Sequence, residues 1–136
     1  MKRLVLILSM IGLCLPIWAG IHSYADHSVL KEGKVIKIRV SETGVHCIPY
    51  DTLKSWGLQP EQVRVLGYGG NMLSENFLLK KWDDLPSVAF YMHKGSDNTF
   101  NSGDYILFYA RGSVKWEYSG GRWHHTQHPY SLYGYY

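Results

Sequence analysis

The sequence predicts an all-β fold, an antiparallel β-sandwich of about six or seven short strands with one short helix, after a cleaved signal peptide. Three observations support this fold class. Short runs in which apolar and polar residues alternate are typical of half-buried strands. Turn-forming glycine, asparagine and proline residues separate these runs at regular intervals. A single stretch, near residues 51–56, has apolar side chains at helical spacing. Many short strands with regular turns favour a sandwich.

Residues 1–25 are typical of an export signal. Two basic residues precede an almost wholly apolar run over residues 4–19. Small residues at the −3 and −1 positions predict cleavage after Ala25, with Ala19 as the second choice. An uncleaved membrane anchor is the alternative, but the apolar run is short for a full span and Pro16 interrupts it.

Removal of the signal changes the charge of the chain. Residues 26–136 carry twelve basic and eleven acidic residues, a net charge of +1 with histidine neutral. No stripe of Lys or Arg remains, so we expect no nucleic-acid binding, and we expect no membrane span in the mature chain. Its length suffices for one domain with a modest core. Cys47 is the only cysteine left, so cohesion must come from packing, to which the many Trp and Tyr residues contribute.

The first elements are expected near the start of the mature chain. Residues 34–40 alternate strictly and predict a half-buried strand. A turn at residues 42–44 allows residues 45–48 to return as a second strand, which would form a hairpin with the first. Asp51 is then expected to cap the short helix, and Gly57 to end it.

Three further strands are expected in the middle of the chain, at residues 63–66, 88–92 and 105–110. Residues 72–85 are expected to form an irregular connection, and residues 94–103 a polar loop. The last of the three strands lacks a polar face, which predicts a central position in its sheet.

The last strand pair is expected at residues 114–118 and 122–126. A two-residue Gly-Gly turn between them is typical of a tight β-hairpin. In that register Tyr118 faces Trp123, and an aromatic pair across two strands helps to fix the register.

The C-terminal part of the chain is rich in aromatic residues, with ten between Asp104 and Tyr136. An apolar, strand-like end needs a partner to cover it. We therefore expect residues 26–136 to be one module of something larger, incomplete at its C-terminal edge. Packing within the sheet accounts for at least half of the aromatic side chains. Those expected to contact a following domain, or to stack on sugars, are Trp116, Tyr118, Trp123, Tyr130, Tyr133, Tyr135 and Tyr136.

No catalytic residue, metal site or cofactor is predicted. His46 and Cys47 are neighbours in an expected strand, so their side chains point to opposite faces and cannot form a catalytic dyad. A packed thiol is the better interpretation of Cys47. Turn formation explains the Asx residues between Asp97 and Asp104, with weak calcium binding as the alternative.

Three histidines near the end of the chain, His124, His125 and His128, resemble a metal cluster. On a strand the side chains of His124 and His125 diverge, and so do those of His125 and His128. Glu117, which could face His124 across the hairpin, is the one nearby residue that could complete a zinc shell. Surface or cross-strand packing is therefore the better interpretation. Residues 83–84, a pair of aspartates shortly before a proline, predict a solvated turn.

Several stretches, taken together, resemble one known family. They are residues 40–45 leading into 49–57, residues 63–70 (Val-Arg-Val-Leu-Gly-Tyr-Gly-Gly), residues 83–86 (Asp-Asp-Leu-Pro), and residues 103–110 (Gly-Asp-Tyr-Ile-Leu-Phe-Tyr-Ala) with the tail 125–136. In order and spacing they resemble the N-terminal, prodomain-like region of the type IX secretion system sortase, a PorU-type member of the gingipain-like cysteine peptidases. The resemblance covers roughly residues 34–136.

The resemblance implies an exported protein of the Bacteroidetes group, found at the outer membrane or cell surface after passage through the periplasm. In that family a β-rich region precedes a caspase-like peptidase domain, which removes C-terminal sorting signals from secreted cargo. The catalytic His and Cys lie downstream of the matched region, so no catalytic residue is assigned to this chain, and we expect no enzyme activity in it.

The partners implied are the downstream peptidase domain, in cis or in trans, and other outer-membrane secretion components. Two alternatives to this function stay open. One is a free-standing exported β-sandwich that binds glycans through its surface aromatics. The other is a truncated remnant with no function of its own.

Overall fold

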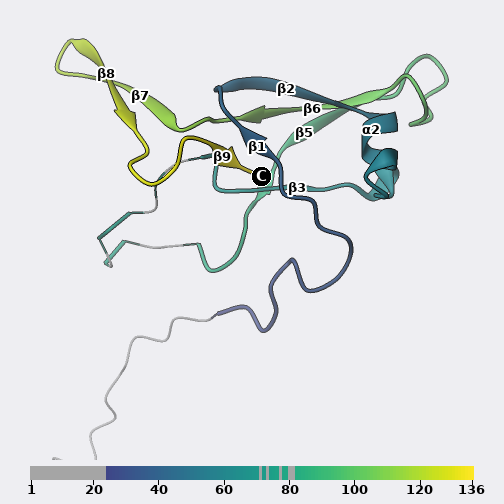
Figure 1. Ribbon diagram of the computed structural model, residues 1–136, viewed down its shortest axis with the longest axis horizontal. Coiled ribbons are helices and arrows are strands. Elements are labelled where there is room, and N and C mark those ends of the chain that lie inside the picture. Colours follow the sequence, from purple (N-terminus) through teal and green to yellow (C-terminus); the bar gives the residue numbers. More distant parts are fainter. Residues whose placement is uncertain (1–23, 71, 73, 77, 80–81) are drawn as a thin grey trace, which may run out of the picture.

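The computed structural model describes residues 24–70, 72, 74–76, 78–79 and 82–136. The predicted export signal lies outside the described residues except for its last two positions, and so does part of the predicted connection over residues 72–85. In the described part, the chain forms four small antiparallel sheets and one short α-helix. Figure 1 shows a three-stranded sheet as the upper layer, with shorter strands below it.

The upper layer consists of β2 (Gly44–Pro49), β6 (Tyr105–Ala110) and β5 (Phe90–His93), in the order β2-β6-β5. The predicted central position of β6 is confirmed. Its inward side chains Ile106 and Phe108 are buried, as expected for a strand with neighbours on both edges and a layer beneath it.

The lower layer contains two short strand pairs. Strand β1 (Arg39–Val40) pairs with β9 (Gly134–Tyr135), and β3 (Val65–Leu66) pairs with β4 (Ser87–Val88). The predicted hairpin between residues 34–40 and 45–48 is therefore wrong. Alternation of side chains does not select a partner, and each of these segments pairs instead with a distant part of the chain that buries its apolar face.

The expected strand at residues 88–92 is divided at Ala89 into β4 and β5. Strand β4 pairs with β3 in the lower layer, and β5 pairs with β6 in the upper layer. The chain therefore crosses from one layer to the other at this point, which a single straight strand could not do.

The helix α2 (Tyr50–Ser55) lies at one end of the upper sheet and buries Leu53 (Figure 1). The prediction that Asp51 caps it is wrong. The capping position is Pro49, which has no side chain for the purpose, and the Asp51 carboxylate accepts a hydrogen bond of 2.9 Å from the Ser102 hydroxyl. The helix ends as predicted, because Gly57 follows it with a φ of +71°. A 3₁₀ turn, η1 (Pro60–Gln62), comes next.

The hydrophobic core lies between the two layers and is small. Partly buried side chains such as Ile38, Trp56 and Tyr136 surround it. Its buried apolar members are Val40, Leu53, Val65, Phe100, Ile106, Phe108 and Ala110.

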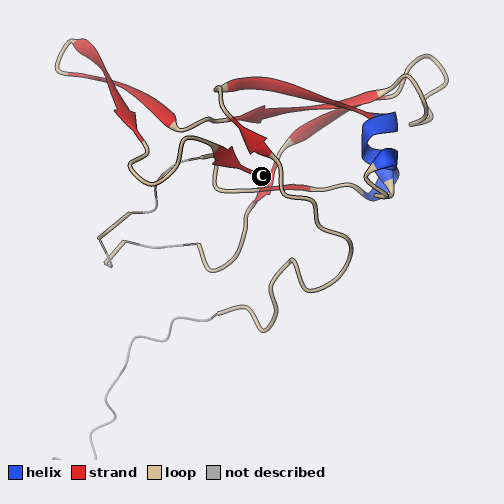
Figure 2. Cartoon of the chain, viewed as in Figure 1, coloured by secondary structure: helices blue, strands red, loops and turns tan. Residues whose placement is uncertain are grey.

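The second prominent element is a hairpin of β7 (Val114–Ser119) and β8 (Arg122–Gln127). Its predicted register is confirmed, with Tyr118 opposite Trp123 across the glycine turn. Both turn glycines have positive φ, which is the backbone conformation that a two-residue hairpin turn requires. Figures 1 and 2 show the hairpin projecting from the end of the sheet opposite α2.

Candidate functional site

The β7–β8 hairpin has two chemically different faces. Residues that are directly opposite in an antiparallel pair, and residues two apart in one strand, lie on the same face. We call one side the aromatic face; it consists of Val114, Trp116, Tyr118, Trp123, His125 and Gln127. We call the other the polar face; it consists of Lys115, Glu117, Ser119, Arg122, His124 and Thr126.

The large side chains of the aromatic face are exposed to solvent. The exposed fractions of Trp116, Tyr118 and Trp123 are 59%, 62% and 65%. They are nevertheless ordered in pairs, because the rings of Tyr118 and Trp123 have centroids 5.3 Å apart and those of Trp116 and His125 are 5.0 Å apart. Such cross-strand contacts stiffen the ribbon while the outer surfaces of the rings stay available.

The polar face is held by contacts of its own. The Lys115 ammonium lies 2.6 Å from the Glu117 carboxylate. Glu117 is directly opposite His124, as predicted, and the His124 Nε2 atom lies 3.2 Å from the Ser119 carbonyl oxygen. These exposed contacts are individually weak, so the stability of the hairpin depends on its aromatic pairs.

The seven aromatic residues predicted to face a partner fall into two groups. Four of them lie in the hairpin or just after it and are exposed: Trp116, Tyr118, Trp123 and Tyr130. The other three contact the segment that contains β1, although Tyr135 is itself 42% exposed: Tyr133, Tyr135 and Tyr136.

Tyr136 packs against Phe108, and its hydroxyl oxygen accepts a hydrogen bond of 2.7 Å from the Arg111 backbone N–H. The Lys37 ammonium lies 4.1 Å from the ring centroid of Tyr135, and the Arg39 guanidinium lies 4.9 Å from that of Tyr133. Such cation–π contacts hold both rings against β1. Strand β9 is therefore packed in part within the chain, with Gly134 buried and Tyr135 exposed.

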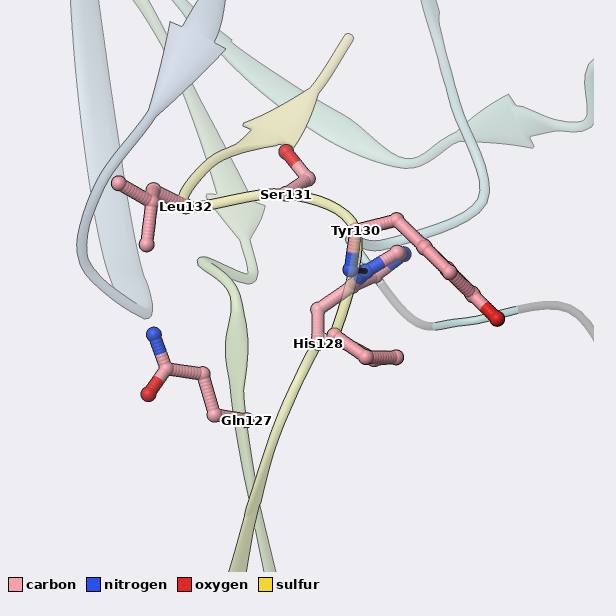
Figure 3. Close-up of a pocket in the computed structure, with 6 residues that line it drawn as sticks. Gln127, His128, Tyr130, Ser131 and Leu132 are labelled. Atoms are coloured by element: carbon pink, nitrogen blue, oxygen red, sulfur yellow. Dashed lines mark hydrogen bonds between the residues drawn. The ribbon is translucent and has the colours of Figure 1, made fainter.

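The connection after the hairpin encloses a hollow of about 410 Å³, lined by residues 127–132 (Figure 3). In the figure Gln127 and Leu132 point to one side of the connection and Tyr130 to the other. His128 Nδ1 accepts a hydrogen bond from the Tyr130 backbone N–H. Because one continuous segment lines the whole hollow, the hollow brings no groups together from different elements.

The structure corrects the interpretation of Cys47. Its neighbour His46 does lie on the opposite face of β2, packed near Phe108 with ring centroids 6.0 Å apart. Cys47, however, is an exposed free thiol and is not packed. The reason is that, among the residues that the structure describes, no layer covers the outer face of the upper sheet.

This outer face was not found from the sequence. It combines an apolar surface with an absence of charged side chains, and Tyr91 and Tyr109 are each more than half exposed. The uniformly apolar sequence of β6 was the signal, since a strand with no polar face has two faces to cover. The outer face consists of Val45, Cys47, Pro49, Tyr91, His93, Tyr105, Leu107 and Tyr109.

The Asx residues of the loop after β5 form turns, as predicted. The Asp97 carboxylate accepts hydrogen bonds from the Thr99 backbone N–H and the Asn101 side-chain amide, at 2.9 and 2.8 Å. The Thr99 bond, followed by that from Asn101, lowers the pKa of Asp97. Buried Asp104 accepts from the Asn101 backbone N–H. Across the described ranges, no three His, Cys, Asp or Glu side chains are placed to hold a metal ion.

The two aspartates at residues 83–84 have a structural role. Asp84 accepts hydrogen bonds from the backbone N–H groups of Val29 and Leu85 and from the Ser28 hydroxyl, and Asp83 accepts from the Ala25 backbone N–H. The Val29 bond is the main cause that lowers the pKa of Asp84, with the Leu85 bond next. The predicted solvated turn thus anchors the N-terminal segment.

Among the chain's described residues, none of the helices is long and apolar enough to cross a membrane. No protein-family model, curated protein or solved structure matches the chain.

Proposed function

We propose that residues 26–136 form a non-catalytic module of an exported, cell-surface cysteine peptidase of the type IX sortase kind. The module docks on the peptidase domain, in cis or in trans, and assists its folding or restricts access to its cleft. The motif order described above supports the family, and the exposed aromatic face of the hairpin is the observation that carries the docking role.

Leaving the aromatic face in water costs the free chain free energy. An isolated two-stranded hairpin is marginally stable, and large exposed aromatic surfaces are typical of interfaces. Tyr and Trp also dominate the binding energy of protein interfaces when their rings become buried. A partner that covers the aromatic face would therefore gain affinity and would order the hairpin. Cover on the outer face of the upper sheet would in turn complete an antiparallel sandwich.

The test is a binding measurement between the secreted chain and a separately expressed peptidase domain of a type IX sortase. The triple variant Trp116→Ser, Tyr118→Ser and Trp123→Ser should lose binding by at least a hundredfold, since interface aromatics commonly contribute 2 kcal/mol or more each. A matched control replaces Lys115, Glu117 and His124 on the polar face with Ser and should bind within a few-fold of the wild type.

Equal loss from both triple variants would contradict docking through the aromatic face, and no binding of the wild type in cis or in trans would contradict the proposal as a whole. A glycan-binding module is the competing function, because paired rings of this kind also stack on sugars. A tryptophan fluorescence titration with envelope polysaccharide, on the same variants, separates the two: a saturable response that the aromatic variant loses would assign the face to glycan.

A further inference from the structure

The turn at residues 83–84 holds a segment that lies far earlier in the chain. The Asp83 carboxylate accepts a hydrogen bond from the Ala25 backbone N–H. The Asp84 carboxylate accepts hydrogen bonds from the Val29 backbone N–H and the Ser28 hydroxyl. The turn therefore binds the N-terminal segment at two points, and each point has a carboxylate of its own.

The contact at Asp83 lies beside the predicted cleavage site, because Ala25 is the last residue of the predicted signal. Hydrolysis of the bond between Ala25 and Asp26 breaks the peptide C–N bond. The hydroxyl of water joins the Ala25 carbonyl carbon, and a proton joins the Asp26 nitrogen. The amine formed there has an ordinary pKa of about 7.7–8.0, so it takes up a further proton and is mostly an α-ammonium at neutral pH. Ala25 leaves with the signal, and Asp83 loses its donor.

We propose that the Asp83 carboxylate binds the α-ammonium of Asp26 in the processed chain. Consecutive Cα atoms are about 3.8 Å apart, so the new terminus lies one residue from the donor that reaches Asp83 in the full chain. Asp84 still fixes Val29 three residues further on, which keeps the terminus near its partner. A hydrogen bond with one charged partner is thus replaced by one in which both partners are charged.

The anchored segment contributes to the wall of a cavity beside the core. Val29 and Leu30 line this cavity together with the core residues Leu53 and Ile106. Removal of the signal therefore strengthens the hold on a segment that screens the core, and so couples processing of the exported chain to completion of its fold.

The new ion pair has a pH dependence of its own. The titratable groups that adjoin it in the sequence are the Asp84 carboxylate in the turn and, in the segment, the Asp26 side chain and the His27 ring. A carboxylate partner favours the charged form of the amine and raises its pKa. The stabilisation is therefore fully present below the ordinary pKa of the amine and is lost as the pH rises through the raised value.

The test begins with the mass of the secreted chain, which should start at Asp26. An NMR titration then measures the pKa of its α-ammonium. The proton affinity of the amine should exceed the ordinary value by roughly twofold to fivefold, the range for an exposed ion pair. Asp83→Asn should return the pKa to the ordinary value. Glu32→Gln, which makes the same change of charge elsewhere in the segment, is the matched control and should leave the pKa raised.

Hydrogen exchange at the Val29 amide of the processed chain gives a second readout. Asp83→Asn should speed this exchange roughly twofold to fivefold near neutral pH, and acetylation of the N-terminal amine should do the same. Because both changes remove one ion pair, their combination should add nothing to either alone.

Three results would overturn the proposal. They are a secreted chain that starts at Gly20, as cleavage after Ala19 would give, an amine pKa that Asp83→Asn leaves unchanged, and additive effects of acetylation and Asp83→Asn. The triple variant of the aromatic face should keep the raised pKa, so a failure here is distinct from a failure of docking by the hairpin.

Discussion

At the residue scale, glycines mark the point where several segments cross. A Cβ atom on Gly134 would lie 2.0 Å from the Arg111 carbonyl oxygen, and one on Gly70 would lie 2.3 Å from the same atom. A Cβ atom on Gly112 would lie 2.3 Å from the Ser41 carbonyl oxygen. Because each obstacle is backbone, it cannot move aside as the end of a flexible side chain could. These glycines therefore allow β9 to reach β1.

Gly134→Ala should lower the free energy of unfolding by about 1–3 kcal/mol, the usual cost of forcing a methyl group into filled space. Gly44→Ala is the control, because its Cβ would meet nothing within 4 Å and its φ is negative. That variant should stay within about 0.5 kcal/mol of the wild type. Urea denaturation measures the free energy of unfolding of both variants, provided that their m-values are equal to that of the wild type. Equal stability of the two variants would contradict the crowding at Gly134.

The anchor at Asp84 predicts a dependence on pH. Its pKa in the folded chain lies below the usual value of 3.8, first because of the Val29 N–H. A carboxyl group whose pKa is lower in the folded chain than in the unfolded chain stabilises the fold at pH values above its pKa in the unfolded chain. This stabilisation is lost as the pH falls through the pKa of the folded chain. The N-terminal segment should therefore detach below about pH 3.8, and Asp84→Asn should detach it in part at neutral pH.

The rate of hydrogen exchange at the Val29 amide, measured by NMR, reports this detachment. Asp97→Asn is the matched control, since the pKa of Asp97 is also lowered but by contacts confined to its own loop. It should leave the Val29 amide unchanged. Unaltered protection of Val29 in the Asp84 variant would show that other contacts hold the segment.

At the element scale, the hairpin is the part with least support from the rest of the fold. Every residue of β7 and β8 is exposed, whereas β6 is buried at alternate positions. Backbone amides of the hairpin should therefore exchange with solvent much faster than those of β6, through local opening. Hydrogen–deuterium exchange of the free chain tests this, and exchange of both elements at the rate of global unfolding would contradict it.

A variant separates local from global stability. Gly121 has a φ of +77°, so Gly121→Ala should cost about 1 kcal/mol in the hairpin. It should speed exchange in β7 and β8 without changing that of β6. Docking of a partner on the aromatic face should slow exchange in the hairpin of the wild type.

The strand pairing that was predicted correctly is the one whose two strands are near in sequence. The β7–β8 register follows from a Gly-Gly turn and the Tyr118–Trp123 pair, both visible within fourteen residues. The pairing of β1 with β9 joins segments almost a hundred residues apart, and nothing in the alternation of residues 34–40 specifies it. The apolar sequence of β6 indicates two faces to cover, but which of them is covered depends on which distant segments meet, and the sequence pattern does not show that.

At the scale of the whole molecule, the lower layer covers one face of the upper sheet, and within the described ranges the outer face stays open. Both sides of β6 are apolar, yet only Ile106, Phe108 and Ala110 are buried, while Tyr109 on the other side is 53% exposed. An apolar face without charge favours self-association when no partner covers it. The free chain should therefore associate with itself at high concentration.

Charge placed on the outer face should remove this association without cost to the fold. Val45 and Tyr109 are directly opposite across β2 and β6, so the double variant Val45→Lys, Tyr109→Glu introduces a facing pair of opposite charges. Sedimentation velocity should show a monomer, and urea denaturation a stability within about 1 kcal/mol of the wild type. Phe108→Ala, on the inner face, is the comparison and should cost about 3–5 kcal/mol. If the double variant lost as much stability as Phe108→Ala, the outer face would have to be covered in the free chain, and the case for a partner there would be lost.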